Sequence, residues 1–202
     1  MNSDKPPADI VESPRIEPRL PPGQVRTEKW PVLHHGLVPD VDLAGWDLTI
    51  DGLVANGQRW NWEEFQKLPR ARVHSDIHCV TRWSRYDNLW EGVSLRSVIA
   101  LAAPKPEARF AIIHAEQGFT TNLPLSELLA DDVLLADKHD GQALTPEHGW
   151  PLRLVVPRRY FWKSAKWIRR IELVDHDTPG FWERNGYHNE ADPWREERFA
   201  DW

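Results

Sequence analysis

The alternation of apolar and polar residues along the chain predicts short β-strands at several places. WDLTIDGLV (46–54) alternates almost residue by residue, as a strand with one buried face does. ARVHSDIHC (71–79) is also strand-like, and RFAIIHAE (109–116) is interpreted as a buried strand. Three later segments have a similar character: the apolar DDVLLAD (131–137), the clearest strand candidate WPLRLVVP (150–157), and WIRRIELVD (167–175).

Three short helices are expected between these strands. Each begins near a residue that can cap a helix or ends at a proline. They are WEEFQKL (62–68) between Asn61 and Pro69, SLRSVIALA (94–102) with Ser94 as its cap and Pro104 behind it, and a short helix that starts near Ser126 after the turn in GFTTNLPLSELL (118–129). Because strands outnumber helices and do not alternate strictly with them, the pattern predicts a mixed α+β fold.

The two ends of the chain show no such periodicity. Residues 1–28 are rich in proline and charge and are interpreted as an extended N-terminal arm that wraps the domain or is partly disordered. Order is expected to begin near WPVLHHG (30–36), so that residues 29–202 form the domain. Its last part, 181–202, is aromatic and charged and is expected to pack as loops. A chain of 202 residues is long enough for one domain with a real core, or two small ones.

Charge and composition exclude some classes of protein. A net charge of −6 argues against a nucleic-acid binder or a polybasic membrane anchor. No stretch approaches the roughly 18 apolar residues of a membrane span. The polar, proline-rich N-terminus is neither a secretory signal nor a twin-arginine leader. The single cysteine fits a reducing compartment. We therefore expect a cytoplasmic protein with no membrane span.

Tryptophan is used unusually often. The chain has 12 Trp and 3 Tyr, and the tryptophans extend from Trp30 to Trp202. Trp offers a large flat surface with one N–H donor, which suits the wall of a pocket for a bulky planar ligand. The alternative is that most of these residues belong to the core.

Familiar catalytic motifs are absent from the sequence. It contains no G-x-G-x-x-G, P-loop, H-E-x-x-H or G-x-S-x-G pattern. One cysteine disfavours a zinc–thiolate site. The nine histidines have no diagnostic metal spacing, and for each of them a surface or hydrogen-bonded structural role is the favoured interpretation.

The only cysteine, Cys79, lies in DIHCVTRWS (76–84), and its neighbours allow three roles. It can be an inert buried side chain. It can be a nucleophile whose pKa is lowered by His78, Arg82 and Arg85. It can also be a ligand to a soft metal ion. The local sequence does not choose among them.

A second cluster follows the strand candidate at 150–157. Between Arg158 and Arg170 the chain carries six cations: Arg158, Arg159, Lys163, Lys166, Arg169 and Arg170. In a net acidic protein this indicates a local anion site, and the KSAK stretch (163–166) adds a hydroxyl and backbone N–H groups that suit a phosphate. Arg169 and Arg170 can instead form the solvated face of a strand.

Together the two clusters resemble the sulfite oxidase family of molybdenum enzymes, in its molybdopterin-binding oxidoreductase domain. C-V-x-x-W-S (79–84), followed by W-x-G-V (90–93), is similar to the family's metal-binding segment. H-G-W-P-L-R-L-V-V-P (148–157), followed by K-S-A-K-W-I (163–168), is similar to its pterin-phosphate segment. The order of the motifs also matches, over about residues 27–175. Within the family the chain resembles the compact sulfite oxidase-like proteins and the catalytic subunit of the bacterial protein-methionine-sulfoxide reductase.

The resemblance implies a fold, a cofactor and a set of site residues. The fold is the family's molybdopterin-binding domain, with mixed sheets and short helices. Cys79 corresponds to the cysteine that ligates molybdenum, and Arg82 beside it is expected to attract an anionic substrate. The residues implied in binding the molybdenum cofactor are Trp30, His34, His35, Cys79, Ala115, His148, Arg153, Lys163, Ser164, Ala165 and Lys166.

The implied activity is two-electron oxygen-atom transfer on a small molecule such as a sulfoxide or sulfite. True sulfite oxidases have Asn-Arg-Arg just past the cysteine, where this chain has Arg82-Trp83-Ser84. Neither the family's immunoglobulin-like dimer domain nor a haem module is expected, so electrons should be exchanged with a separate protein. Two other functions stay open: a non-catalytic pterin- or anion-binding module, and a thiol enzyme that uses Cys79 as nucleophile.

Overall fold

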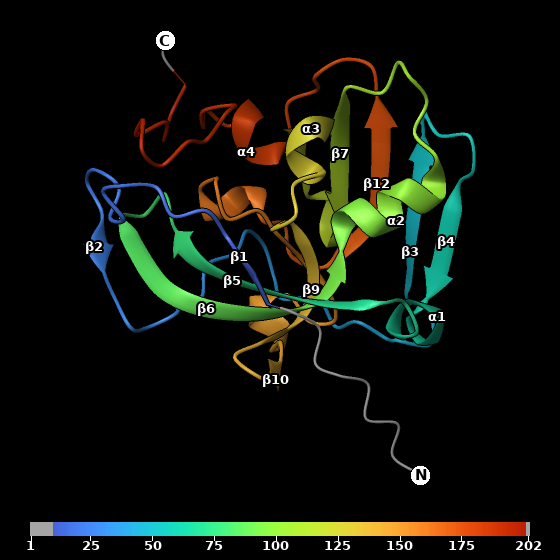
Figure 1. Cartoon of the computed structure of the whole chain (residues 1–202), viewed down its shortest axis with the longest axis horizontal. Coiled ribbons are helices and arrows are strands. Elements are labelled where there is room, and N and C mark those ends of the chain that lie inside the picture. The colour runs from blue at the N-terminus through green and yellow to red at the C-terminus, as the bar shows by residue number, and fades with distance from the viewer. Residues whose placement is uncertain (1–9, 201–202) are drawn as a thin grey trace.

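Two mixed β-sheets carry the fold in the computed structural model, which describes residues 10–200 (Figure 1). The mixed α+β class expected from the sequence is confirmed. Residues 1–9 of the expected arm and residues 201–202, which include Trp202, lie outside the described part of the chain.

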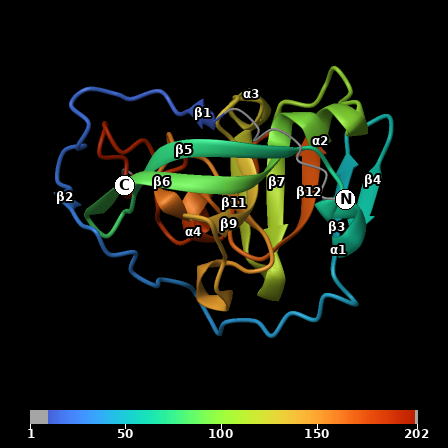
Figure 2. The same ribbon diagram turned by 60° about the horizontal axis from the view of Figure 1, so that its bottom comes forward.

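The first sheet has the strand order β1-β5-β6-β9-β10, with β11 also paired to β9 and β2 to β6. Its strands are β1 (Ile10–Glu12), β2 (Val25–Arg26), β5 (Arg70–His78), β6 (Trp83–Ser94), β9 (Leu134–His139), β10 (Gln142–Ala143) and β11 (Arg153–Val155). The long β5 and β6 form an antiparallel hairpin, while β1 and β2 add to it in parallel. Figure 2 shows the segment from β1 to β3 running around the outside of these strands.

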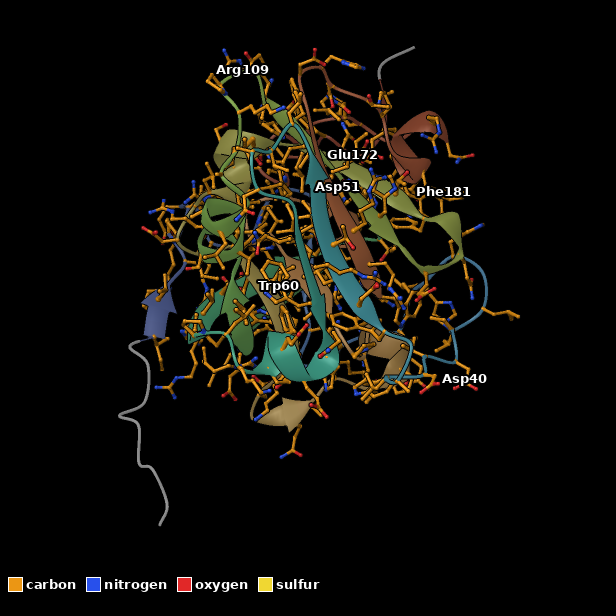
Figure 3. All side chains as sticks on the ribbon, turned by 90° about the vertical axis from the view of Figure 1, so that its right-hand side faces the viewer. Asp40, Asp51, Trp60, Arg109, Glu172 and Phe181 are labelled. Atoms are coloured by element: carbon orange, nitrogen blue, oxygen red, sulfur yellow. The ribbon has the colours of Figure 1, made fainter. Side chains whose placement is uncertain are left out.

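The second sheet has the order β4-β3-β12-β7-β8. Its strands are β3 (Asp47–Gly52), β4 (Gln58–Asn61), β7 (Phe110–Ala115), β8 (Thr120–Pro124) and β12 (Ile168–Val174). They run at a steep angle to β5 and β6 (Figure 1). One face is polar, with Asp51 and Glu172 on it (Figure 3), whereas the alternate residues Ile50 and Ile171 are buried. This alternation is what a half-solvated sheet requires.

Helices are few and short in the described chain. They are α1 (Trp62–Gln66), α2 (Leu95–Ala102), α3 (Leu125–Leu128), α4 (Phe181–Arg184) and the 3-10 turns η1 (Glu116–Gly118), η2 (Pro146–His148) and η3 (Phe161–Lys163). Asn61 caps α1 in a capping box with Glu64, as predicted. Ser94 occupies the cap position of α2, but its side chain makes no capping bond. It is still paired with Leu134 as the last residue of β6.

Three expectations about elements need correction. The 12-residue β6 was not predicted, and β8 lies within a segment expected to hold only a turn and a helix. The strand expected over 150–157 is only three residues long, because its pairing with β9 ends at Val155. The expected short helix near Ser126 is α3, and the tail holds α4 among its loops.

The core lies on both sides of the first sheet. The larger cluster packs the inner face of the second sheet and α2 against the first sheet, through residues such as Ile113, Val98 and Leu135. The smaller cluster, around Ile77 and Trp90, lies under the segment that carries Trp30. Each fully buried side chain of this size contributes about 1.5–3 kcal/mol. Both sheets are therefore rigid supports for the loops at their ends.

Candidate cofactor-binding site

A cleft of about 290 Å³ lies where loops from the two sheets meet. This volume is near the lower end of the range typical of small-molecule sites, about 300–1,000 Å³. Its lining comes from the segment after β2, the β5–β6 turn, η1, η2, β11, the residues after η3, and α4 with the tail. Segments far apart in the sequence thus build one site.

Nine of the residues singled out from the sequence line this cleft: Trp30, His34, His35, Cys79, His148, Arg153, Ser164, Ala165 and Lys166. Three others do not line it. Ala115 is buried at the end of β7, where it pairs with Ile168. Arg82 is exposed, with its guanidinium beside Gly23, and Lys163 is directed to the other side of its loop.

Cys79 is presented by the tight turn between β5 and β6. The N–H of Arg82 donates to the carbonyl of Cys79 at 3.1 Å, and the N–H of Cys79 donates to the carbonyl of Trp83 at 2.9 Å. The Sγ atom faces the cleft, 3.1 Å from the hydroxyl of Thr81. Arg82 closes the turn in the left-handed region, with φ at 70°. The turn therefore delivers a single sulfur atom to the site.

The environment of Cys79 does not activate it as a free nucleophile. Burial raises the pKa of its thiol, and the hydrogen bond from Thr81 opposes this only in part. None of the expected activators places a charge against the sulfur. Arg82 is exposed, Arg85 donates to Asp140, and burial lowers the pKa of His78 to about 4, which keeps it neutral. A buried thiol of this kind is inert until an ion binds it.

Two cations form the polar part of the cleft: Arg153, which is buried, and Lys166, which is half-buried. Arg153 is 1% exposed and donates to the carbonyls of His148 and Ser164 at 2.8 and 2.9 Å. Lys166 donates to the carbonyls of Leu33 and Glu147 at 2.7 and 2.6 Å. Neither forms an ion pair with a carboxylate of the described residues. Buried positive charge without a negative partner is a receptor for an anion.

The pKa values of these two groups show the cost of their burial. Burial lowers the pKa of Arg153 to about 9. Burial, and next the charge of Arg153, lower the pKa of Lys166 to about 7. A bound anion would relieve both effects, because it supplies the missing negative charge. Ser164, whose hydroxyl accepts from the N–H of Val156 at 2.9 Å, can add a donor beside them.

Flat aromatic groups form the walls. The ring of His148 stacks on Trp30 at 3.9 Å between centroids, and its Nε2 donates to the carbonyl of Trp30 at 3.3 Å. His35 packs on Phe181 at 4.3 Å, and His34 lies 6.0 Å from the ring of Trp167. Five tryptophans line the cleft: Trp30, Trp83, Trp162, Trp167 and Trp182. Others, including Trp46 and Trp90, belong to the core, so both interpretations of the tryptophan content hold for part of the set.

The basic cluster of 158–170 is mostly not an anion site. Its cations are used in ion pairs with acidic side chains: Arg158 with Asp132, Arg159 with Glu127, Lys163 with Glu183, Arg169 with Glu116 and Asp47, and Arg170 with Asp51 and Glu172. Lys163 is 1% exposed, and its ammonium lies 2.6 Å from Glu183. Only Lys166 of the six lines the cleft.

Sequence reasoning missed several lining residues. Thr81 lies beside Cys79 at a variable position of its motif, whereas Gln117, Phe119 and Tyr187 carry no motif and reach the cleft only through the fold. The abundance of tryptophan predicted that some indole rings line a pocket. No spacing in the sequence identified Trp162 and Trp182 as two of them.

The cleft combines a soft sulfur atom, flat aromatic walls and two cations that lack an acidic partner among the described residues. In the described chain no three His, Cys, Asp or Glu side chains gather as an all-protein metal site. These features define a protein that binds a planar, anionic cofactor able to carry a thiophilic metal. Residues 35–182 match the family described as the oxidoreductase molybdopterin binding domain. The chain belongs to this family and is a molybdenum-cofactor oxidoreductase.

Known proteins that resemble the chain differ in length. It is 51% identical to "Uncharacterized oxidoreductase YuiH" of Bacillus subtilis, and the alignment covers 90% of this chain and 92% of that protein. It is 32% identical to "Protein-methionine-sulfoxide reductase catalytic subunit MsrP" of Gluconobacter oxydans, covering 69% of this chain and 50% of that protein. The solved structure of "Sulfane Dehydrogenase SoxCD" from Paracoccus pantotrophus matches with a TM-score of 0.67 and 25% identity, over 76% of this chain and 43% of that one. The chain thus spans half or less of these last two relatives.

The helices give one further finding. Within residues 10–200, none is both long enough and apolar enough to cross a membrane.

Proposed function

We propose that this protein catalyses two-electron oxygen-atom transfer on a small substrate at a molybdenum ligated by Cys79. One observation carries the proposal: the only thiol of the chain faces the cleft that Arg153 and Lys166 line with unpaired positive charge. Arg153, Lys166 and Ser164 would hold the phosphate of the cofactor, and Trp30 with His148 would flank its planar ring system. When bound, the cofactor supplies the two-electron redox couple and the remaining sulfur ligands.

The chain's own residues set the conditions for this chemistry. Cys79 loses its proton only when a cation offsets the effect of burial, so its thiolate forms together with the metal bond. The hydroxyl of Thr81, 3.1 Å from the sulfur, can then donate to it. The aromatic walls exclude water around the reacting centre.

The lining of the cleft supports a neutral substrate such as a sulfoxide over sulfite. Arg82, the residue expected to attract an anion, lies outside the cleft and is exposed. The side chains that line the cleft nearest to Cys79 in sequence are Val80, Thr81 and Trp83, and none of them is charged. Exchange of electrons with a separate protein stays part of the proposal, supported by the name "catalytic subunit" of the Gluconobacter relative. A cytoplasmic location stays a prediction from the cysteine content.

The test compares the wild-type chain with Cys79→Ser, both produced in a host that makes the molybdenum cofactor. Molybdenum and pterin per chain are measured, together with dye-linked turnover of sulfoxides, N-oxides and sulfite. We expect about one molybdenum per wild-type chain. The variant should keep its pterin and lose turnover by more than about 100-fold, since even outer-shell partners of a metal ligand contribute about 10–100-fold.

Ser126→Ala is the control, because Ser126 is exposed on α3 and does not line the cleft. Full turnover in Cys79→Ser would rule out the ligand role. A higher kcat/KM for sulfite than for every sulfoxide would rule out the neutral substrate.

A further inference from the structure

The backbone of the Cys79 turn is held from behind by two side chains far from it in sequence. Gln24 Nε2 donates to the carbonyl of Cys79 at 3.0 Å, and Arg198 Nη1 donates to the carbonyl of Val80 at 2.7 Å. Gln24 and Arg198 are 7% and 5% exposed. Both lie outside the family match over residues 35–182. Segments at the two ends of the described chain therefore meet at the metal-ligand candidate.

Arg198 joins three segments of the chain. Besides the turn, its Nη2 donates to the carbonyls of Pro22 and Gly23 at 3.3 and 3.5 Å. Its guanidinium lies 5.0 Å from the ring centroid of Tyr160, which is fully buried. A carboxylate oxygen of Glu196 lies 3.6 Å from its Nη2. A planar group with a fork of donors can bridge carbonyls in this way, whereas a lysine ammonium cannot reach them all.

The turn needs such support. It is closed by Arg82 in the left-handed region, which a non-glycine residue adopts only at a cost. Within the turn the carbonyl of Cys79 accepts from the N–H of Arg82, and Gln24 and Arg198 add donors from outside the hairpin. Without donors behind it, the turn would relax and the direction of Cys79 Sγ would no longer be fixed.

We propose that Arg198 is a positioning residue that holds the Cys79 turn in its sulfur-presenting geometry, with Gln24 as its partner. This role rests on the proposed function, in which Cys79 is the metal ligand. It assigns the tail and the N-terminal segment to the catalytic site, although neither belongs to the matched family region.

The first test uses the single cysteine as its own reporter. The full cofactor-free chain is labelled with a maleimide, and the rate at Cys79 is measured for wild type, Arg198→Met, Arg198→Lys and Gln24→Met. We expect the rate to rise about tenfold in Arg198→Met and less in the other two. Arg195→Met is the matched control, since Arg195 belongs to the same tail and is 72% exposed.

Hydrogen exchange separates local from general loosening. Amides of residues 76–84 should exchange faster in Arg198→Met, while those of β7 and β12 stay as in the wild type. An equal rise in β7 and β12, or in Arg195→Met, would overturn the proposal. A labelling rate within twofold of wild type in folded Arg198→Lys and Gln24→Met would also overturn it. These two variants decide the test if Arg198→Met does not fold.

The loaded enzyme gives a second readout. We expect Arg198→Lys to keep its molybdenum, to lose kcat with little change in KM, and to show a shifted electron paramagnetic resonance signal of the reduced metal. An unchanged signal with unchanged kcat would contradict the role. If Cys79→Ser keeps full turnover, the proposed function fails, but the labelling result still decides whether Arg198 fixes the turn.

Discussion

Lys166 shows how partial burial prepares one side chain for a ligand. Its ammonium donates only to carbonyl groups and shares the cleft with the buried Arg153. The sequence pointed to Lys166 through a run of six cations, but the other five cations of this run do not line the cleft. The other five cations are used by acidic neighbours in the fold, and which carboxylate meets which cation depends on contacts far apart in the sequence.

Lys166→Gln should weaken retention of the cofactor about tenfold, because one charge-assisted hydrogen bond to the phosphate is lost. The measurement is pterin per chain after extended dialysis of protein made in a cofactor-competent host. Lys105→Gln is the control, because Lys105 is exposed and outside the cleft. Equal losses in the two variants would show that Lys166 does not contact the cofactor.

His139, at the end of β9, makes the fold sensitive to acid. Its Nε2 lies 3.0 Å from both Arg85 Nη1 and Asn88 Oδ1, and the guanidinium beside it disfavours a positive charge on the ring. Burial lowers the pKa of His139 to about 4, with Asp140 opposing and Arg85 adding to the effect. Between pH 6.5 and 4 the unfolded chain therefore binds a proton that the folded chain refuses. Stability is fully present above this window and falls as the pH is lowered through it.

His139→Gln should remove part of this acid sensitivity. Between pH 7 and pH 4 the variant is expected to lose about 1–2 kcal/mol less unfolding free energy than the wild type. Urea unfolding at several pH values measures the difference. His176→Gln, at a side chain that is 76% exposed, should follow the wild-type curve. An identical pH dependence in His139→Gln would assign the acid sensitivity to other groups.

At the scale of elements, β6 and β9 meet unusually closely. A Cβ atom at Gly92 would lie 1.9 Å from the carbonyl oxygen of Leu135, and the pairing shifts register between Glu91 and Gly92. Backbone cannot move aside as a flexible side chain can. Only glycine allows the two strands to approach in this way.

Gly92→Ala should therefore destabilise the fold by about 2–4 kcal/mol, measured by chemical denaturation. Gly57→Ala is the matched control, because its added Cβ would be at 3.6 Å from the nearest atom, an ordinary contact. That control should stay within about 0.5 kcal/mol of wild type. A similarly small effect at Gly92 would mean that the two strands can separate without cost.

The pattern of apolar residues predicted β3, β5, β7 and β12 because each alternates or is continuously apolar. It missed β6, whose residues WSRYDNLWEGVS mix charged, aromatic and small side chains near the site. Strand β11 is shorter than predicted because its pairing with β9 covers only Arg153 to Val155. A periodic pattern indicates that one face of a strand is buried. It does not predict a strand whose residues are chosen for a binding site.

At the scale of the whole molecule, one buried ion pair connects α4 in the tail with η3. Lys163 and Glu183 are 1% and 2% exposed, and Asn122 accepts from the same ammonium through two oxygens at 2.9 and 3.2 Å. The sequence assigned Lys163 to the cofactor because it belongs to the KSAK stretch. In the structure, Lys163 of η3 contacts Asn122 of β8 and Glu183 of α4 and so connects the three elements.

Glu183→Gln should cost about 3–5 kcal/mol of unfolding free energy, because it leaves a buried ammonium without its counter-charge. Thermal and urea unfolding of the cofactor-free chain measure it. Asp131→Asn removes an exposed pair with Arg96 and should cost less than about 1 kcal/mol. A small effect at Glu183 would imply that Lys163 is neutral in the folded protein.

The site could be predicted from the sequence where motifs are local, as at Cys79 and in the stretch from His148 to Lys166. Its remaining members come from the tail and from η1, which reach the cleft only through long-range pairing. Gln24 and Arg198 illustrate the limit, because each acts on a carbonyl group of the Cys79 turn. Every residue has a backbone carbonyl group, so the sequence does not show which side chain donates to a particular one.

The five indole rings around the cleft have an optical consequence. A bound cofactor that absorbs where indole emits would accept energy from the rings that line its site. Loading of the protein should thus be visible as quenching of its own fluorescence. The chain carries a built-in gauge of cofactor occupancy, independent of any substrate.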